Sequence, residues 1–197
     1  MDLKINPMLI PGRWRQGYVL DYHTLSSTHI GDDEYGHPQF DTKRTELGDL
    51  LYRLKYKSDS TVVAEIVEEV ASFMSSWKPG AAVITPVPPS RLRTMQPIFI
   101  IGEALAKRIE IPWIIDGVRR IKEIPELKNV YNYDERIRLL TGAYDVDRTQ
   151  IQGQRVLLFD DLYRSGATMN TVTAALYDLG GALDVFALAL TRTRSNR

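Results

Sequence analysis

The fold is decided by the run Arg155 to Asn170, which reads Arg-Val-Leu-Leu-Phe-Asp-Asp-Leu-Tyr-Arg-Ser-Gly-Ala-Thr-Met-Asn. Its four apolar residues, 156–159, have the length of a buried strand in a parallel sheet. Asp160 and Asp161 follow directly. A polar turn then leads into a segment whose apolar residues recur at helical spacing and which ends at two glycines, 180–181. The run therefore predicts a strand, a turn and a helix of an α/β sheet.

Two features of this unit favour a ligand. In open α/β sheets, ligands bind beyond the carboxyl ends of strands, and helix N-termini attract anions. The carboxylates of Asp160 and Asp161 can accept hydrogen bonds from sugar hydroxyls, while the Ser165 and Thr168 hydroxyls and the loop N–H groups can donate to a phosphate. This chemistry predicts a ribose-phosphate site. An ordinary strand–helix connection, with Asp161 in solvent and Thr168 capping the helix, remains open on the residues alone.

The same run resembles the phosphoribosyl-diphosphate signature of type I phosphoribosyltransferases. That signature is an apolar strand, two acids, three intervening residues, a hydroxyl residue, a glycine, a small residue and a threonine. The resemblance implies that Asp160 and Asp161 hold the ribose hydroxyls, directly or through Mg²⁺ bound mainly to substrate and water oxygens. It also implies a phosphate-binding loop made of Arg164, Ser165, Gly166, Ala167 and Thr168.

A second loop follows the strand predicted over residues 81–84 and reads Thr-Pro-Val-Pro-Pro-Ser-Arg from Thr85 to Arg91. Its prolines fix the backbone and remove N–H donors. In type I phosphoribosyltransferases the loop in this place holds the diphosphate, which implies that role for Pro88, Ser90 and Arg91. A stiff turn with exposed arginines is the alternative.

The segment from 117 to 138 lies between a strand predicted over 113–115 and an edge segment over 142–146. In type I enzymes this is the place of a mobile loop that closes over the diphosphate. The resemblance implies that Arg119 and Lys122, with Arg120, meet the leaving group, where a cation stabilises charge that grows in the transition state. A solvated basic loop is the alternative.

Three runs resemble the ComF family, described as amidophosphoribosyltransferase-like competence proteins: 48–57, the 86–88 loop with Arg91 and Arg93, and 142–146. ComF proteins usually open with a four-cysteine zinc finger, whereas this chain has no cysteine. The resemblance implies transfer of the phosphoribosyl group of phosphoribosyl diphosphate to an unidentified nitrogen acceptor, with release of pyrophosphate. The alternative function is non-catalytic: sensing of phosphoribosyl diphosphate or a nucleotide, or handling of single-stranded DNA.

Composition sets the wider frame. The 197 residues are 44% hydrophobic and 25% charged, as in a compact globular protein. We expect a β-rich N-terminal cap or hood over residues 1–45 and an α/β core over 46–197, with a mostly parallel central sheet flanked by helices. Helices are predicted over 46–57, 61–77 and 98–109, and a last buried strand over 185–190.

Charge, cysteine content and hydropathy limit the class of protein and its cellular location. The 25 basic and 25 acidic residues balance, which does not favour a dedicated nucleic-acid binder. There is no apolar stretch of about 18 residues to span a membrane, and no signal peptide is expected behind Met1-Asp2-Leu3-Lys4. The absence of cysteine is compatible with a cytoplasmic protein. His23, His29 and His37 lack tight metal-ligand spacing, so surface or hydrogen-bonded histidines are expected. A homodimer is left open.

Overall fold

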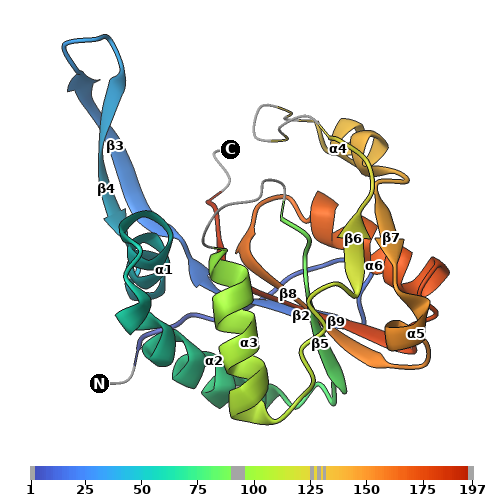
Figure 1. The fold of residues 1–197 in the computed structure, drawn as a ribbon. Coiled ribbons are helices and arrows are strands. Elements are labelled where there is room, and N and C mark those ends of the chain that lie inside the picture. The colour runs from blue at the N-terminus through green and yellow to red at the C-terminus, as the bar shows by residue number, and fades with distance from the viewer. Residues whose placement is uncertain (1–2, 90–95, 125–126, 128–129, 131, 195–197) are drawn as a thin grey trace.

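The computed structural model describes residues 3–89, 96–124, 127, 130 and 132–194. Its centre is a five-stranded sheet in the order β1-β2-β9-β8-β5 (Figure 1). The strands are β1 (Met8–Leu9), β2 (Gln16–Tyr22), β5 (Val83–Pro86), β8 (Arg155–Tyr163) and β9 (Asp184–Arg192). All neighbours pair in parallel except β1, which is antiparallel to β2. The predicted mostly parallel sheet flanked by helices is confirmed.

One face of the sheet is covered by α1 (Glu46–Lys57), the 3₁₀ turn η1 (Ser60–Val62), α2 (Val63–Trp77) and α3 (Pro97–Ile109). Alternate residues of β8 serve the two faces: Leu157 and Phe159 pack against these helices, and Val156 and Leu158 belong to the core on the opposite side. The helices predicted over 46–57, 61–77 and 98–109 are confirmed. None of the helices within the described ranges is long and apolar enough to cross a membrane.

The opposite face carries α6 (Ala167–Asp178), the short α5 (Arg148–Ile151) and a two-stranded antiparallel sheet of β6 (Val118–Arg120) and β7 (Tyr144–Val146). Helix α4 (Tyr133–Leu140) lies beside α6 (Figure 1). The edge segment predicted over 142–146 is thus a strand of this small sheet, not of the central one. Its antiparallel partner β6 ends at Arg120.

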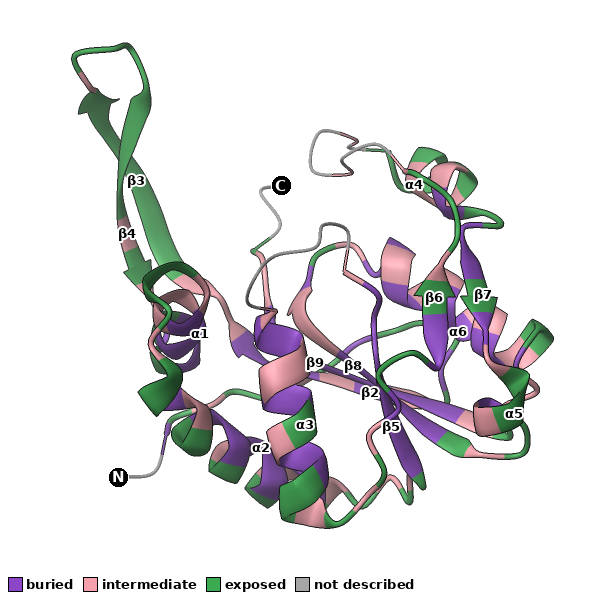
Figure 2. Cartoon of the chain, in the orientation of Figure 1, coloured by how far each residue is buried: buried purple, intermediate pink, exposed green. Residues whose placement is uncertain are grey.

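The first 45 residues do not form one cap. Strand β2 lies inside the central sheet, where parallel pairing with β9 buries Val19 and Leu20 completely. Only the hairpin of β3 (Thr24–Asp32) and β4 (Pro38–Arg44) projects from the body, and nearly all of it is exposed (Figure 2). The expected cap is therefore corrected to this hairpin, because the apolar residues of β2 find their burial in the main core. A division into two domains at residue 45 stays a prediction.

The strand predicted over 113–115 is wrong. Trp113 makes a single isolated parallel bridge with Ile84. Backbone bonds of 2.8–2.9 Å join Ile84 to Pro112 and Ile114, but the Thr85 hydroxyl then donates to the Ile114 carbonyl at 2.9 Å. Because that side chain takes the carbonyl and a turn follows at once, the pairing does not continue.

Candidate functional site

Strand β8 carries both signature acids inside its regular structure. It runs on to Tyr163, so Asp160 and Asp161 are the sixth and seventh of its nine residues and stand beyond the end of β5, whose last pair is Pro86 with Phe159. The backbone N–H of Asp161 donates to Oδ1 of Asp160 at 2.8 Å. Consecutive strand residues point to opposite sides. The two carboxylates therefore approach the sheet end from its two faces.

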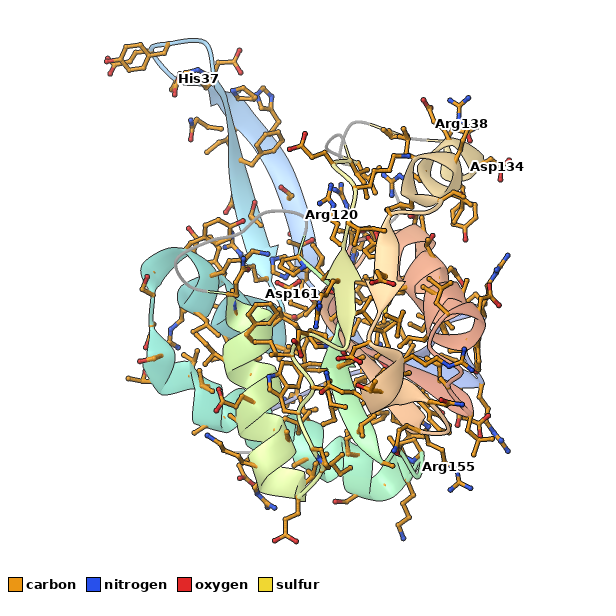
Figure 3. All side chains as sticks on the ribbon, turned by 45° about the vertical axis from the view of Figure 1, so that its right-hand side comes forward. His37, Arg120, Asp134, Arg138, Arg155 and Asp161 are labelled. Atoms are coloured by element: carbon orange, nitrogen blue, oxygen red, sulfur yellow. The ribbon has the colours of Figure 1, made fainter. Side chains whose placement is uncertain are left out.

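A cavity of about 800 Å³ opens at this end of the sheet. It brings together eight of the residues that the sequence singled out: Pro88, Asp160, Asp161, Arg164, Ser165, Gly166, Ala167 and Thr168. Strand end, turn and helix start thus share one hollow, as predicted for a ligand at the carboxyl edge of a parallel sheet. Figure 3 shows Asp161 near Arg120 in this region, with Arg155 at the opposite end of β8.

The turn before α6 is shaped for an anion. Gly166 has φ +77°, a conformation that favours glycine, and a Cβ there would lie 2.6 Å from the Tyr163 hydroxyl. The N-cap residue Gly166 has no side chain to cap α6, although Oγ of Ser165 accepts a long 3.4 Å hydrogen bond from the N–H of Ala167. Ala167 and Thr168, the first residues of α6, line the cavity. The uncapped N–H groups of a helix start carry partial positive charge and bind phosphate or carboxylate groups. The predicted phosphate-binding turn therefore has the required backbone.

Arg136 of α4 supports the same turn and was missed as a site residue by the sequence reasoning. Its Nη1 donates to Oγ of Ser165 at 2.8 Å, and its Nε donates to the carbonyl of Val130. Burial first, then the nearby Arg164, lowers the pKa of Arg136, which nevertheless stays charged. Because the arginine donates to Oγ, the hydroxyl hydrogen of Ser165 is left to point at another acceptor.

The two acids differ in their surroundings. Burial is the main cause that raises the pKa of Asp160 well above its ordinary value, and the neighbouring charge of Asp161 raises it further. Asp161 has a cation beside it: Nζ of Lys55, at the end of α1, lies 3.1 Å from its Oδ2. Both side chains of this pair are 23% exposed and both line the cavity. The pair is therefore open to the cavity and is not sealed in the core.

Of the three cations predicted to meet the leaving group, only Arg120 lines the cavity. Arg119 is exposed and lies 3.2 Å from Asp116, and Lys122 is also exposed; neither lines the cavity. Arg120 does line it, while its guanidinium donates to the carbonyls of Lys122 and Ile124. Adjacent residues of β6 face opposite ways, which separates Arg119 from Arg120.

Some predicted positions lie outside the described residues. Ser90 and Arg91, expected to hold the diphosphate, are among them, as is Arg93. Of that loop, Pro88 is described and is buried in the cavity wall. The diphosphate role of Ser90 and Arg91 stays a prediction.

Tyr144 of β7 is a further wall residue that sequence reasoning missed. Burial raises its pKa to about 12, with a smaller lowering by Arg120 and a raising by Asp160. The phenol is therefore protonated at neutral pH and can act as a hydrogen-bond donor towards the cavity. Its signals in the sequence were its place in the run 142–146, which resembles ComF proteins, and the β-like pattern of that run.

The carboxylates fit a hard cation that is shared with a ligand. Within the described ranges, no group of three or more His, Cys, Asp or Glu side chains could hold a metal ion by itself. Mg²⁺ is commonly bound through one or two carboxylates together with phosphate oxygens and water. Asp160 and Asp161 supply that donor set at the cavity. Two of the three histidines lie elsewhere: His29 and His37 pair with Asp32 and Asp33 on the projecting hairpin (Figure 3). His23 lies 3.2 Å from the Thr191 hydroxyl, which donates to the carbonyl of Asp161.

Comparisons with known proteins agree with the signature. No family model matches the chain. The competence protein ComFC of Bacillus subtilis (strain 168) is 26% identical over 145 residues, which make up 73% of this chain and 58% of that protein. The chain thus spans less than two thirds of the relative's length. The resemblance to ComF proteins that the sequence predicted is confirmed by this similarity.

Solved structures similar to this chain include two adenine phosphoribosyltransferases. The enzyme from Thermoanaerobacter pseudethanolicus is 18% identical with a TM-score of 0.45, over 84% of this chain and 95% of that chain. The enzyme from Trypanosoma brucei, solved with AMP, pyrophosphate and ribose-5-phosphate, is 13% identical with a TM-score of 0.48, over 93% of this chain and 74% of that chain.

Proposed function

We propose that this chain, which resembles the ComF-like phosphoribosyltransferases, binds phosphoribosyl diphosphate with Mg²⁺ and transfers the phosphoribosyl group to a nitrogen acceptor, releasing pyrophosphate. One observation carries the proposal: the two acids of β8 and the turn that begins α6 line a single open cavity of about 800 Å³. A volume of this size suits a small-molecule ligand.

Each part of the ligand has a matching group. The 5′-phosphate would lie on the N–H groups of Gly166, Ala167 and Thr168, with the Ser165 hydroxyl as a further donor. The ribose 2′- and 3′-hydroxyls would donate to Asp160 and Asp161. The acceptor would enter along the remaining wall, which includes Tyr144.

Mg²⁺ would be held by Asp160 and Asp161 together with ligand and water oxygens. Bound there, it supplies neutralisation of the negative charge on the diphosphate. Arg120, which lines the cavity, would serve the same purpose. It would take the part that the sequence suggested for Arg119 and Lys122. Since charge on the departing oxygens grows in the transition state, fixed cations there accelerate the step.

Calorimetry with phosphoribosyl diphosphate, with and without Mg²⁺, tests the binding part. A screen of nucleobases and amines for pyrophosphate release tests the transfer. We expect Mg²⁺-dependent binding and release with at least one nitrogen compound. A folded protein that does not bind phosphoribosyl diphosphate in Mg²⁺ would overturn the proposal.

A second candidate, binding without turnover, is favoured by the positions of Arg119 and Lys122 outside the cavity wall. A sensor of phosphoribosyl diphosphate needs the grip on ribose and phosphate but no groups for the leaving pyrophosphate. Tight Mg²⁺-dependent binding without pyrophosphate release for any nitrogen compound would select this second function over the first.

A further inference from the structure

Lys55 and Asp161 are 106 residues apart in the chain and meet at the cavity. Nζ of the lysine lies 3.1 Å from Oδ2 of the aspartate, and each side chain is 23% exposed. Lys55 is the third residue from the end of α1, and Asp161 lies near the end of β8. The pair therefore bridges the helical layer and the strand end across the mouth of the site.

The aspartate is the fixed member of the pair. Its carbonyl accepts a 3.1 Å hydrogen bond from the Thr191 hydroxyl, which is in turn 3.2 Å from Nδ1 of His23. Strand β8 is paired on both sides of Asp161 with β9, through Asp160 and Leu162. The backbone that carries the carboxylate thus has little room to shift.

The lysine side chain is the movable member. Helix α1 is anchored by its buried leucines 47, 50, 51 and 54, so the helix itself stays in place. Beyond it, Lys55 extends a flexible four-carbon stem with a strongly hydrated ammonium group. With about a quarter of the side chain exposed, the ammonium can leave Asp161 and remain in the cavity.

The charges explain why a cation lies beside Asp161. Two carboxylates on successive residues repel each other when both are ionised. Lys55 compensates the charge of Asp161. A divalent cation attracts the same carboxylate with twice the charge, so the ammonium and the metal compete for it.

We propose that Lys55 is a tethered counter-ion, which pairs with Asp161 and is displaced when a divalent cation binds there. The displaced ammonium then needs an anion, which the diphosphate of the incoming substrate supplies. Metal alone is consequently held weakly, and metal with diphosphate is held tightly. The inference rests on the proposed function, because it assigns Asp161 to a divalent cation.

Titration of the full chain with Mn²⁺ alone, followed by electron paramagnetic resonance, tests this competition without any turnover. Lys55→Met removes the charge and keeps the apolar stem. We expect it to bind Mn²⁺ about fivefold to tenfold more tightly than the wild type. Lys55→Gln should behave in the same way, and Lys55→Arg, which keeps the charge, should stay within about twofold of the wild type. Lys57→Met, an exposed change on the same helix, is the matched control and should have no effect.

If the two uncharged variants bind Mn²⁺ no more tightly than the wild type, or bind none at all, the counter-ion proposal is overturned. The same result from Lys57→Met as from Lys55→Met would also overturn it, since a general change in net charge would then suffice. Binding of phosphoribosyl diphosphate with Mg²⁺ to the wild type is measured separately. Its failure would remove the proposed function, while tighter Mn²⁺ binding by Lys55→Met would still support the competition at Asp161.

Discussion

Arg136 and Ser165 are 29 residues apart, and Nη1 of the arginine donates a 2.8 Å hydrogen bond to Oγ of the serine. This bond joins α4 to the turn that begins α6. It also orients the serine hydroxyl, because an oxygen that accepts from a guanidinium presents its own hydrogen elsewhere. The turn that would receive the 5′-phosphate is thus held from outside the signature run.

Arg136→Met is expected to lower the affinity for phosphoribosyl diphosphate about tenfold, because the site loses a half-buried cation and the Ser165 hydroxyl loses the shorter of its two donor contacts. Calorimetry in the presence of Mg²⁺ measures the change. Arg138→Met is the control: that side chain is 78% exposed and lies 4.0 Å from Glu135. Equal affinities in the two variants would contradict the role given to Arg136.

Replacing both Asp160 and Asp161 with Asn is expected to weaken Mg²⁺-dependent binding of phosphoribosyl diphosphate by at least about tenfold, since neutral amides are poor ligands for Mg²⁺. The fold should survive. Burial disfavours ionised Asp160, and a partly exposed pair such as Lys55–Asp161 contributes at most about 1 kcal/mol. Calorimetry measures the affinity for phosphoribosyl diphosphate, and thermal unfolding measures the stability of the variant.

Asp145→Asn, an exposed change on β7, is the control for the double variant. Unchanged affinity in a folded Asp160→Asn, Asp161→Asn protein would refute the assignment of the two carboxylates. A double variant that no longer folds would contradict the stability argument instead.

Gly166→Ala is expected to destabilise the protein by about 1–3 kcal/mol and to reduce phosphate binding. The new methyl group would be forced to positive φ and against the Tyr163 hydroxyl, which would displace the turn. Gly142→Ala separates the two effects: its φ is +67°, but no atom of the described residues lies within 4 Å of the added carbon. It should cost about 1 kcal/mol and leave the affinity unchanged. Urea unfolding measures the stability of each variant, and calorimetry measures its affinity for phosphoribosyl diphosphate. Reduced affinity in Gly142→Ala would contradict the claim that Gly166→Ala acts through the turn at the phosphate.

Asp21→Asn is expected to stabilise the protein at neutral pH. Burial is the main cause that raises the pKa of this carboxyl in the fold above 3.8. The folded state therefore binds the proton more tightly than the unfolded state, and the wild type loses stability as the pH rises through the folded-state pKa. The amide has no charge to bury, and its oxygen can still accept from the N–H of Tyr22, 2.7 Å from the carboxylate.

Urea unfolding of wild type and Asp21→Asn across the pH range measures this dependence. The variant's advantage in unfolding free energy should be largest above the folded-state pKa of Asp21 and should shrink as the pH falls towards 3.8. Asp41→Asn, an exposed change on the hairpin, serves as control. An advantage that is independent of pH would show that burial of the charge is not its source.

The sequence by itself determined the signature unit of this protein. The apolar run of β8, the two acids, the turn at Gly166 and the periodic residues of α6 are all local signals, because strand, turn and helix depend on neighbouring residues. The same holds for α1, α2 and α3, whose apolar stripes predicted both their extent and the face that they bury.

Only the tertiary structure decided which distant groups complete the site. Lys55 and Arg136 reach the cavity because α1 and α4 pack where they do, and no local pattern encodes that distance. Arg120 rather than Arg119 lines the cavity because a strand alternates its faces, and the register with β7 selects the face. Likewise β2 enters the central sheet because its apolar residues are buried by β9, 170 residues further along at Gln16 and Phe186. The residues that line the cavity and the position of β2 thus depend on long-range strand pairing and packing, which a local sequence pattern does not specify.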